Sequence, residues 1–135
     1  MRAVLDPNIL IAALLSPSGA PAQIISGWLG GEFELVVSEV LLSELERAFA
    51  YPKLRRRIPA DDAAEYVSLL RLTAILAPDS EARAHRSADP GDDYLLALAE
   101  NERAVLVSGD QHLLALADEL PIQTARTFLD GLADA

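Results

Sequence analysis

Apolar and polar residues come in blocks along this chain, and the blocks predict strands and helices in turn. Short apolar runs without polar alternation predict strands at residues 3–5, 33–37, 73–77, 104–107 and 121–126. Runs of this kind are typical of strands that are covered on both faces of a sheet. The segments between them are longer and carry apolar residues at helical spacing.

These longer segments predict the helices. Asp6 and Pro7 precede the first one, and both a carboxylate cap and a proline in the first turn favour a helix start. The predicted helices span residues 8–15, 21–29, 39–49, 60–72, 92–102 and 111–120, and the tail is expected to close with a helical turn. Residues 53–59 are predicted to form a loop, and residues 78–91 a polar connection.

Strands that alternate with helices predict a single α/β domain over residues 1–135, a three-layer α/β/α sandwich with a mainly parallel sheet of about five strands. In such sheets, sites form beyond the carboxyl ends of the strands. Asp6 and Asp110 each follow a predicted strand and begin a predicted helix, and Asp92 and Asp93 begin another. Each acid alone is compatible with a helix cap. Together they predict an acidic cluster at one edge of the sheet.

Composition narrows the chemistry of such a cluster. The chain has no cysteine, only two histidines and a net charge of −10, which excludes a cysteine–zinc site, a thiol nucleophile and a histone-like DNA-binding protein. Gathered carboxylates repel one another unless a cation offsets their charge. Hard oxygen ligands favour Mg²⁺ or Mn²⁺. Glu44 is a fourth candidate ligand, because it lies at the rim of the apolar stripe of the helix predicted at residues 39–49.

Positive charge is concentrated in one place. Residues 61–135 carry fifteen acidic and five basic side chains, whereas residues 1–60 carry six of each. The dense basic run consists of Lys53, Arg55, Arg56 and Arg57, and it either holds RNA phosphates or forms a solvated loop. Tyr51 and Tyr94 could stack on bases, although packing against the protein is the favoured interpretation. No segment is long enough to span a membrane, and a cytoplasmic location is expected.

Four stretches of the chain resemble the four acidic motifs of PIN domains, in the same order and at similar spacing. They are DPNIL from Asp6, SEVLLSELERAF around Glu44, DPGDDYLLALA, and VSGDQHLL around Asp110. The resemblance covers essentially the whole chain. It is closest to the stand-alone bacterial and archaeal PIN proteins that are toxin components of toxin–antitoxin pairs.

The resemblance implies an endoribonuclease that depends on Mg²⁺ or Mn²⁺ and leaves 3′-hydroxyl and 5′-phosphate ends. It also implies an RNA substrate, a separate antitoxin chain and a homodimer. Pro7 stands where threonine or serine is commoner in the family. The residues that the resemblance assigns are the catalytic, metal-binding acids Asp6, Glu44, Asp93 and Asp110, with Asp92 as the alternative to Asp93, and the supporting residues Asn8 and Ser108.

Two other functional classes are open. In a non-catalytic RNA- or protein-binding PIN-like module, the acids would only cap helices, and Mn²⁺ would add almost no thermal stability. A phosphoacceptor receiver domain needs an acidic pair after its first strand and a lysine after a late strand. Here Asp6 stands alone before a proline, and the only lysine, Lys53, lies in the basic run.

Overall fold

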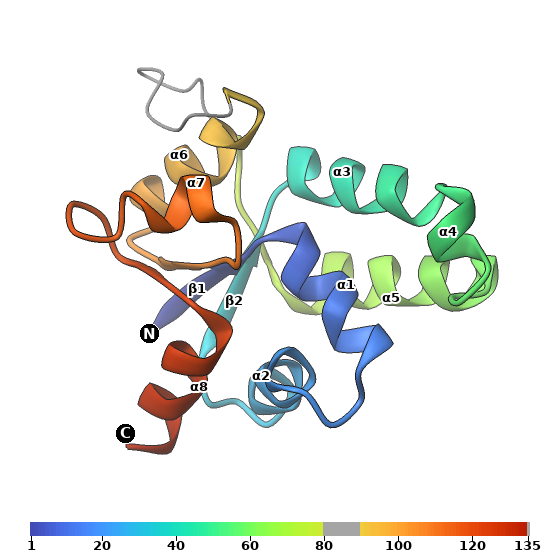
Figure 1. Ribbon diagram of the computed structural model, residues 1–135, viewed down its shortest axis with the longest axis horizontal. Helices are drawn as coiled ribbons and strands as arrows, with labels where there is room; N and C mark the ends of the chain where they lie inside the picture. Colours follow the sequence, from blue (N-terminus) through green and yellow to red (C-terminus); the bar gives the residue numbers. More distant parts are fainter. Residues whose placement is uncertain (80–89, 135) are drawn as a thin grey trace.

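A parallel sheet with helices on both of its sides forms the body of the protein (Figure 1). The computed structural model describes residues 1–79 and 90–134. Within them the strands are β1 (Arg2–Leu5), β2 (Glu34–Val37), β3 (Ile75–Leu76), β4 (Val105–Val107) and β5 (Ile122–Gln123). They lie in the order β3-β2-β1-β4-β5, and each neighbouring pair is parallel. The predicted α/β sandwich with a five-stranded sheet is therefore confirmed.

The helices cover the sheet from two sides. In Figure 1, α1, α3 and α5 lie on one side of β1 and β2, and α6 and α7 lie on the other. A 3₁₀ turn at Pro90–Asp92 leads into α6. The helix bounds are α1 (Pro7–Leu15), α2 (Ala20–Leu29), α3 (Glu39–Phe49), α4 (Pro52–Arg55), α5 (Ala60–Thr73), α6 (Asp93–Asn101), α7 (Gln111–Leu114) and α8 (Ala125–Ala133).

The strand order contains a switch point at the centre of the sheet. The chain moves outward from β1 to β2 and β3, and then returns to β4 on the other side of β1. Val4 pairs with Val36 on one side and with Leu106 on the other. The carboxyl ends of β1 and β4 are therefore adjacent, and ligands bind at such a point in open α/β sheets.

Aliphatic side chains on both faces of the sheet form the core. Leu5, Leu35 and Leu106 from three adjacent strands are almost completely buried. Burying a leucine stabilises a fold by about 1.5–3 kcal/mol, so these strands are firmly held. Tyr66 of α5 adds a polar tie, because its hydroxyl donates a 2.8 Å hydrogen bond to the carbonyl oxygen of Leu10 in α1.

Several predicted boundaries were wrong. The predicted loop at residues 53–59 begins instead as the short helix α4, with Pro52 in its first turn, where proline is favoured. The last strand is shorter and the last helix longer than predicted, because the Thr124 hydroxyl accepts a 3.2 Å hydrogen bond from the Thr127 N–H and caps α8. The helix predicted at residues 111–120 ends at Leu114, and α5 extends through Thr73, which shortens β3. Residues 80–89 of the predicted polar connection lie outside the described residues.

No single helix in residues 1–79 and 90–134 is long and apolar enough to cross a membrane. In the same part of the chain, α1 and α2 taken together reach the required length and composition, but the chain bends by 100° between them.

Candidate acidic site

Asp6 and Ser108 form the centre of the candidate site, at the adjacent carboxyl ends of β1 and β4. Asp6 is 5% exposed and Ser108 is completely buried. The Ser108 hydroxyl donates a 2.8 Å hydrogen bond to Oδ2 of Asp6. Oδ1 of Asp6 accepts a 2.9 Å bond from the backbone N–H of Asn8 and so caps α1. Both carboxylate oxygens of Asp6 are thus held in fixed directions, and each keeps a further lone pair.

Asp110 is joined to this centre through the same serine. Its backbone N–H donates a 3.0 Å hydrogen bond to the Ser108 hydroxyl oxygen. Its carboxylate accepts a 2.8 Å bond from the His112 N–H and caps α7, and its side chain is 27% exposed. The predicted meeting of Asp6 and Asp110 at one edge of the sheet is thereby observed, with Asp6 buried and Asp110 facing partly toward solvent.

The electrostatics of Asp6 follow from this arrangement. Burial raises the pKa of Asp6 above its ordinary value, and the negative charge of Asp110 raises it further. The hydrogen bonds from the Asn8 N–H and from Ser108 act in the opposite direction but do not cancel the effect of burial on the pKa. A positive charge near both carboxylates would favour their ionised form.

Other acids approach the same region around the hydroxyl of Tyr94, the second residue of α6. Burial raises the pKa of Tyr94, and the negative charges of Asp6, Glu44 and Asp92 reinforce the rise. The charges of these three carboxylates are therefore all felt by the Tyr94 hydroxyl. The Glu44 side chain is 41% exposed and forms a 3.2 Å ion pair with Arg47 of α3.

Asp93, the other predicted acid of this motif, is the first residue of α6 and is 7% exposed. Asp92 occupies the cap position of α6 without a side-chain capping hydrogen bond. Asp93 is thus buried and Asp92 partly exposed, so the two neighbouring acids that the sequence left as alternatives differ in burial. The assignment of either one as a metal ligand stays a prediction.

Asp79 is an acid of this region that the sequence analysis did not select. It lies just beyond β3, and its Oδ2 accepts a 3.0 Å hydrogen bond from the Val40 N–H in the first turn of α3. Its charge also contributes to the raised pKa of Tyr94. The signal was present in the sequence, because Asp79 follows a predicted strand just as Asp6 and Asp110 do.

The donor chemistry fits a hard divalent cation. Asp6 and Asp110 supply carboxylate oxygens, which Mg²⁺ and Mn²⁺ prefer. Among the described residues, no lysine or arginine forms an ion pair with either acid. Three or more acidic or histidine side chains are not grouped closely enough in residues 1–79 and 90–134 to enclose a metal ion. Asp6 and Asp110 would thus supply only two carboxylates to a cation, and further ligands would have to approach them.

Ser108→Ala tests whether the shared hydroxyl positions the two acids. Losing a hydrogen bond to a buried carboxylate should lower the free energy of unfolding by about 1.5–3 kcal/mol. If Asp6 holds a divalent cation, as the resemblance to PIN domains implies, loss of this outer partner should also lower the expected nuclease activity about 10–100-fold. Urea unfolding and RNA cleavage rates measure the two effects.

Ser38→Ala is the matched control for this substitution. Ser38 is equally buried at the end of β2, and its hydroxyl accepts a 3.2 Å bond from the Leu41 N–H as the cap of α3. Its loss should cost about 1 kcal/mol of stability with little loss of activity. Equal activities of the two alanine variants would show that Ser108 has only a structural role.

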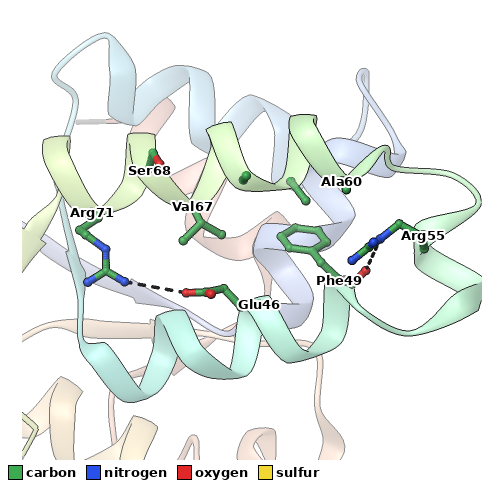
Figure 2. Close-up of a pocket in the computed structure, with 9 residues that line it drawn as sticks. Glu46, Phe49, Arg55, Ala60, Val67, Ser68 and Arg71 are labelled. Carbon is green, nitrogen blue, oxygen red and sulfur yellow. Dashed lines mark hydrogen bonds and ion pairs between the residues drawn. The ribbon is translucent and has the colours of Figure 1, made fainter.

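A hollow of about 360 Å³ lies elsewhere, between α3 and α5 (Figure 2). Phe49, Ala63 and Val67 line its apolar part, and Arg71 reaches across to Glu46 at 3.8 Å. Neither Asp6 nor any other predicted acid lines it. This hollow is therefore separate from the candidate site.

Comparison with known proteins agrees with this geometry. A family model described as PIN domain matches residues 2–112. An uncharacterized protein of Methanocaldococcus jannaschii is 25% identical over 121 residues, which are 88% of this chain and 77% of that protein. The chain is also similar to three solved structures at identities that show the fold alone.

The first of these structures is PAE2754 from Pyrobaculum aerophilum, with a TM-score of 0.70 and 18% identity over 100% of this chain and 91% of that one. The second is VapBC2 from Rickettsia felis, bound to a DNA fragment from its promoter. Its TM-score is 0.66 and its sequence identity 15%, over 92% of this chain and 98% of that one. The third is VapBC-1 from nontypeable Haemophilus influenzae, with a TM-score of 0.64 and 20% identity over 93% of this chain and 99% of that one. With a family model covering most of its length and the matching fold, this chain belongs to the PIN domain family.

Proposed function

We propose that this protein is an endoribonuclease dependent on Mg²⁺ or Mn²⁺, and the toxin component of a toxin–antitoxin pair. PIN domains are generally nucleases, and they are typically dependent on divalent metals. The observation that carries the proposal is the pair of carboxylates, Asp6 and Asp110, that one buried serine joins at the switch point of the sheet.

The chain's own residues supply the framework for hydrolysis. Asp6 and Asp110 would hold the cation, with Glu44 and either Asp93 or Asp92 as further ligands. When bound, the cation supplies a water of lowered pKa and offsets the charge of the scissile phosphate. The backbone N–H groups of Asn8 and His112 fix the two carboxylates, so their oxygens do not have to reorient when substrate arrives.

The toxin assignment draws on the structural neighbours. VapBC2, VapBC-1 and FitAcB from Neisseria gonorrhoeae share this fold, and toxins of this kind are paired with an antitoxin chain. We infer that the antitoxin of this protein is likewise a separate chain. The expected homodimer and the cytoplasmic location stay predictions.

The direct test is cleavage of end-labelled single-stranded and structured RNA with Mn²⁺, with Mg²⁺ and with EDTA. We expect cleavage only with a divalent metal, and products with 3′-hydroxyl and 5′-phosphate ends. A DNA oligonucleotide of the same sequence is the control for substrate class. Equal cleavage in Mn²⁺ and EDTA would contradict the proposal.

A non-catalytic PIN-like module is the second candidate. One observation favours it: the described acids do not surround a point as metal ligands do. In that case RNA or a protein would bind without cleavage, and Mn²⁺ would change neither binding nor thermal stability.

A further inference from the structure

The cationic run of the sequence lies away from the acids. We define the basic patch as Lys53, Arg55, Arg56 and Arg57, in α4 and the turn after it. Figure 1 shows α4 at the end of α3 that is distant from the strands. Because α3 has 11 residues and a helix rises 1.5 Å per residue, the patch begins about 16 Å from the sheet edge. It therefore forms no ion pair with Asp6 or Asp110.

The basic patch is free to meet a ligand. All four side chains are solvent-accessible, and none of them forms an ion pair with a described acid. Nε of Arg55 donates a 3.4 Å hydrogen bond to the Phe49 carbonyl, and Nε of Arg56 a 3.2 Å bond to the Pro52 carbonyl. These bonds anchor two guanidinium groups to the backbone and leave their terminal nitrogens available.

A stripe of side chains connects the acids to the basic patch. Val40, Glu44 and Arg47 lie at the spacing of a single face of α3, and Tyr51 lies just beyond the end of that helix, before α4. Tyr51 was expected to pack against the protein, but it is 61% exposed. It directly precedes α4, whereas Glu44, a candidate ligand, lies about 8 Å back from the end of α3 along the helix axis. The stripe therefore leads from the candidate site to an exposed aromatic ring and then to cations.

These features suit a single strand of nucleic acid. Without a bound cation, an acidic site repels phosphates, so in that state the affinity for RNA has to come from elsewhere on the surface. Exposed aromatic rings stack on bases of any sequence, and unpaired cations bind phosphates. The patch is a local excess of four positive charges on a chain with net charge −10.

We propose that this α3 stripe and the basic patch form a second binding site for single-stranded RNA, with a base stacked on Tyr51 and phosphates on Lys53, Arg56 and Arg57. The proposal rests on the proposed nuclease function and extends it. Stacked nucleotides repeat about every 3.4 Å, so a strand needs about five nucleotides to cover the distance of about 16 Å from the sheet edge to the patch. The second site thus engages only strands that extend at least that far from the cleaved bond. Long RNA gains from the site, and a trinucleotide does not.

The first test measures binding without cleavage. A fluorescein-labelled 12-nucleotide RNA is titrated with the protein in EDTA at several salt concentrations. Lys53→Gln/Arg57→Gln should reduce the slope of log K against log [salt] by about 1.4, for two lost phosphate contacts. Tyr51→Ser should weaken binding about five-fold or more, and Tyr51→Phe should keep the affinity.

The matched control removes the same charge elsewhere. Arg103 and Arg126 are exposed and lie outside the patch, before β4 and in α8. Arg103→Gln/Arg126→Gln should leave the salt slope as in the wild type. An equal change in both double variants would overturn the proposal, since it would reveal only a loss of overall charge. Unchanged RNA affinity with weakened binding of polyglutamate would also overturn it and assign the patch to an acidic protein.

The second test separates this inference from the nuclease function. With Mn²⁺, the ratio of kcat/KM for the 12-nucleotide RNA to that for a trinucleotide should fall about five-fold or more in Tyr51→Ser. A wild-type ratio in that variant would overturn the second site while leaving the nuclease intact. Patch-dependent RNA binding without any cleavage would support the second site and contradict the nuclease.

Discussion

Asp6→Asn and Asp110→Asn are each expected to lower metal-dependent RNA cleavage by more than about 100-fold. Removing a residue that only hydrogen-bonds to a metal ligand lowers metal affinity or activity about 10–100-fold. Asp6 and Asp110 are the proposed ligands themselves, so their loss should have a larger effect. The fold should survive, because an asparagine oxygen can still accept the capping N–H bond from Asn8 or His112. Single-turnover cleavage rates and circular dichroism measure the two outcomes.

Asp130→Asn is the control for these variants. Asp130 is an exposed acid in α8, where it lies 3.9 Å from Arg126. Its substitution removes one negative charge and should leave cleavage at the wild-type rate. Wild-type cleavage by both Asp6→Asn and Asp110→Asn would show that the acidic site has been misassigned.

Mn²⁺ is expected to stabilise the wild-type protein strongly. A ligand that binds only the native state adds about 2.7 kcal/mol at a concentration 100 times its Kd. For a chain of this length that is a rise in Tm of roughly 10 °C. Asp6→Asn and Asp110→Asn should lose most of the rise, whereas Asp130→Asn should keep it. Thermal unfolding at increasing Mn²⁺ concentration provides the measurement, and a flat wild-type response would favour the non-catalytic module.

Without metal, we expect Asp6→Asn to be more stable than the wild-type protein at neutral pH. The folded-state pKa of Asp6 lies above the ordinary value, so the native state binds a proton more tightly than the unfolded chain does. Wild-type stability therefore falls as pH rises from about 4 through the raised pKa, and an asparagine does not titrate. Asp6→Asn should match the wild type near pH 4 and be the more stable of the two at pH 7. Added Mn²⁺ should then make the wild type the more stable protein.

The fold was predictable because its strongest signals are local. The apolar runs that became β1 and β4 contain few polar residues, so each marked a strand buried on both faces. Asp6 and Asp110 were found because each follows such a run and caps the next helix. The predicted boundaries were wrong where one capping residue fixes the start of a helix, as Thr124 does for α8.

The site was less predictable, because its details depend on contacts between distant segments. The hydroxyl of Ser108 reaches Asp6 across 102 residues of sequence, and no periodicity encodes which oxygen it meets. Asp79 acts on α3 across 39 residues in the same way. The exposure of Tyr51 depends on the turn into α4, which the sequence analysis predicted as a loop.

The hydrogen bond between Ser108 and Asp6 joins residues that are synthesised far apart in time, so the candidate site can form only late in translation. A nascent chain that has emerged only through α5 already carries Asp6 and Glu44, but neither β4 nor the serine that β4 delivers. Pairing of β4 with β1 is a late, long-range event, because both the intervening segments and the strand itself must first leave the ribosome. The molecule is therefore assembled without its acidic pair for most of its own translation, and the pair forms when the sheet is completed.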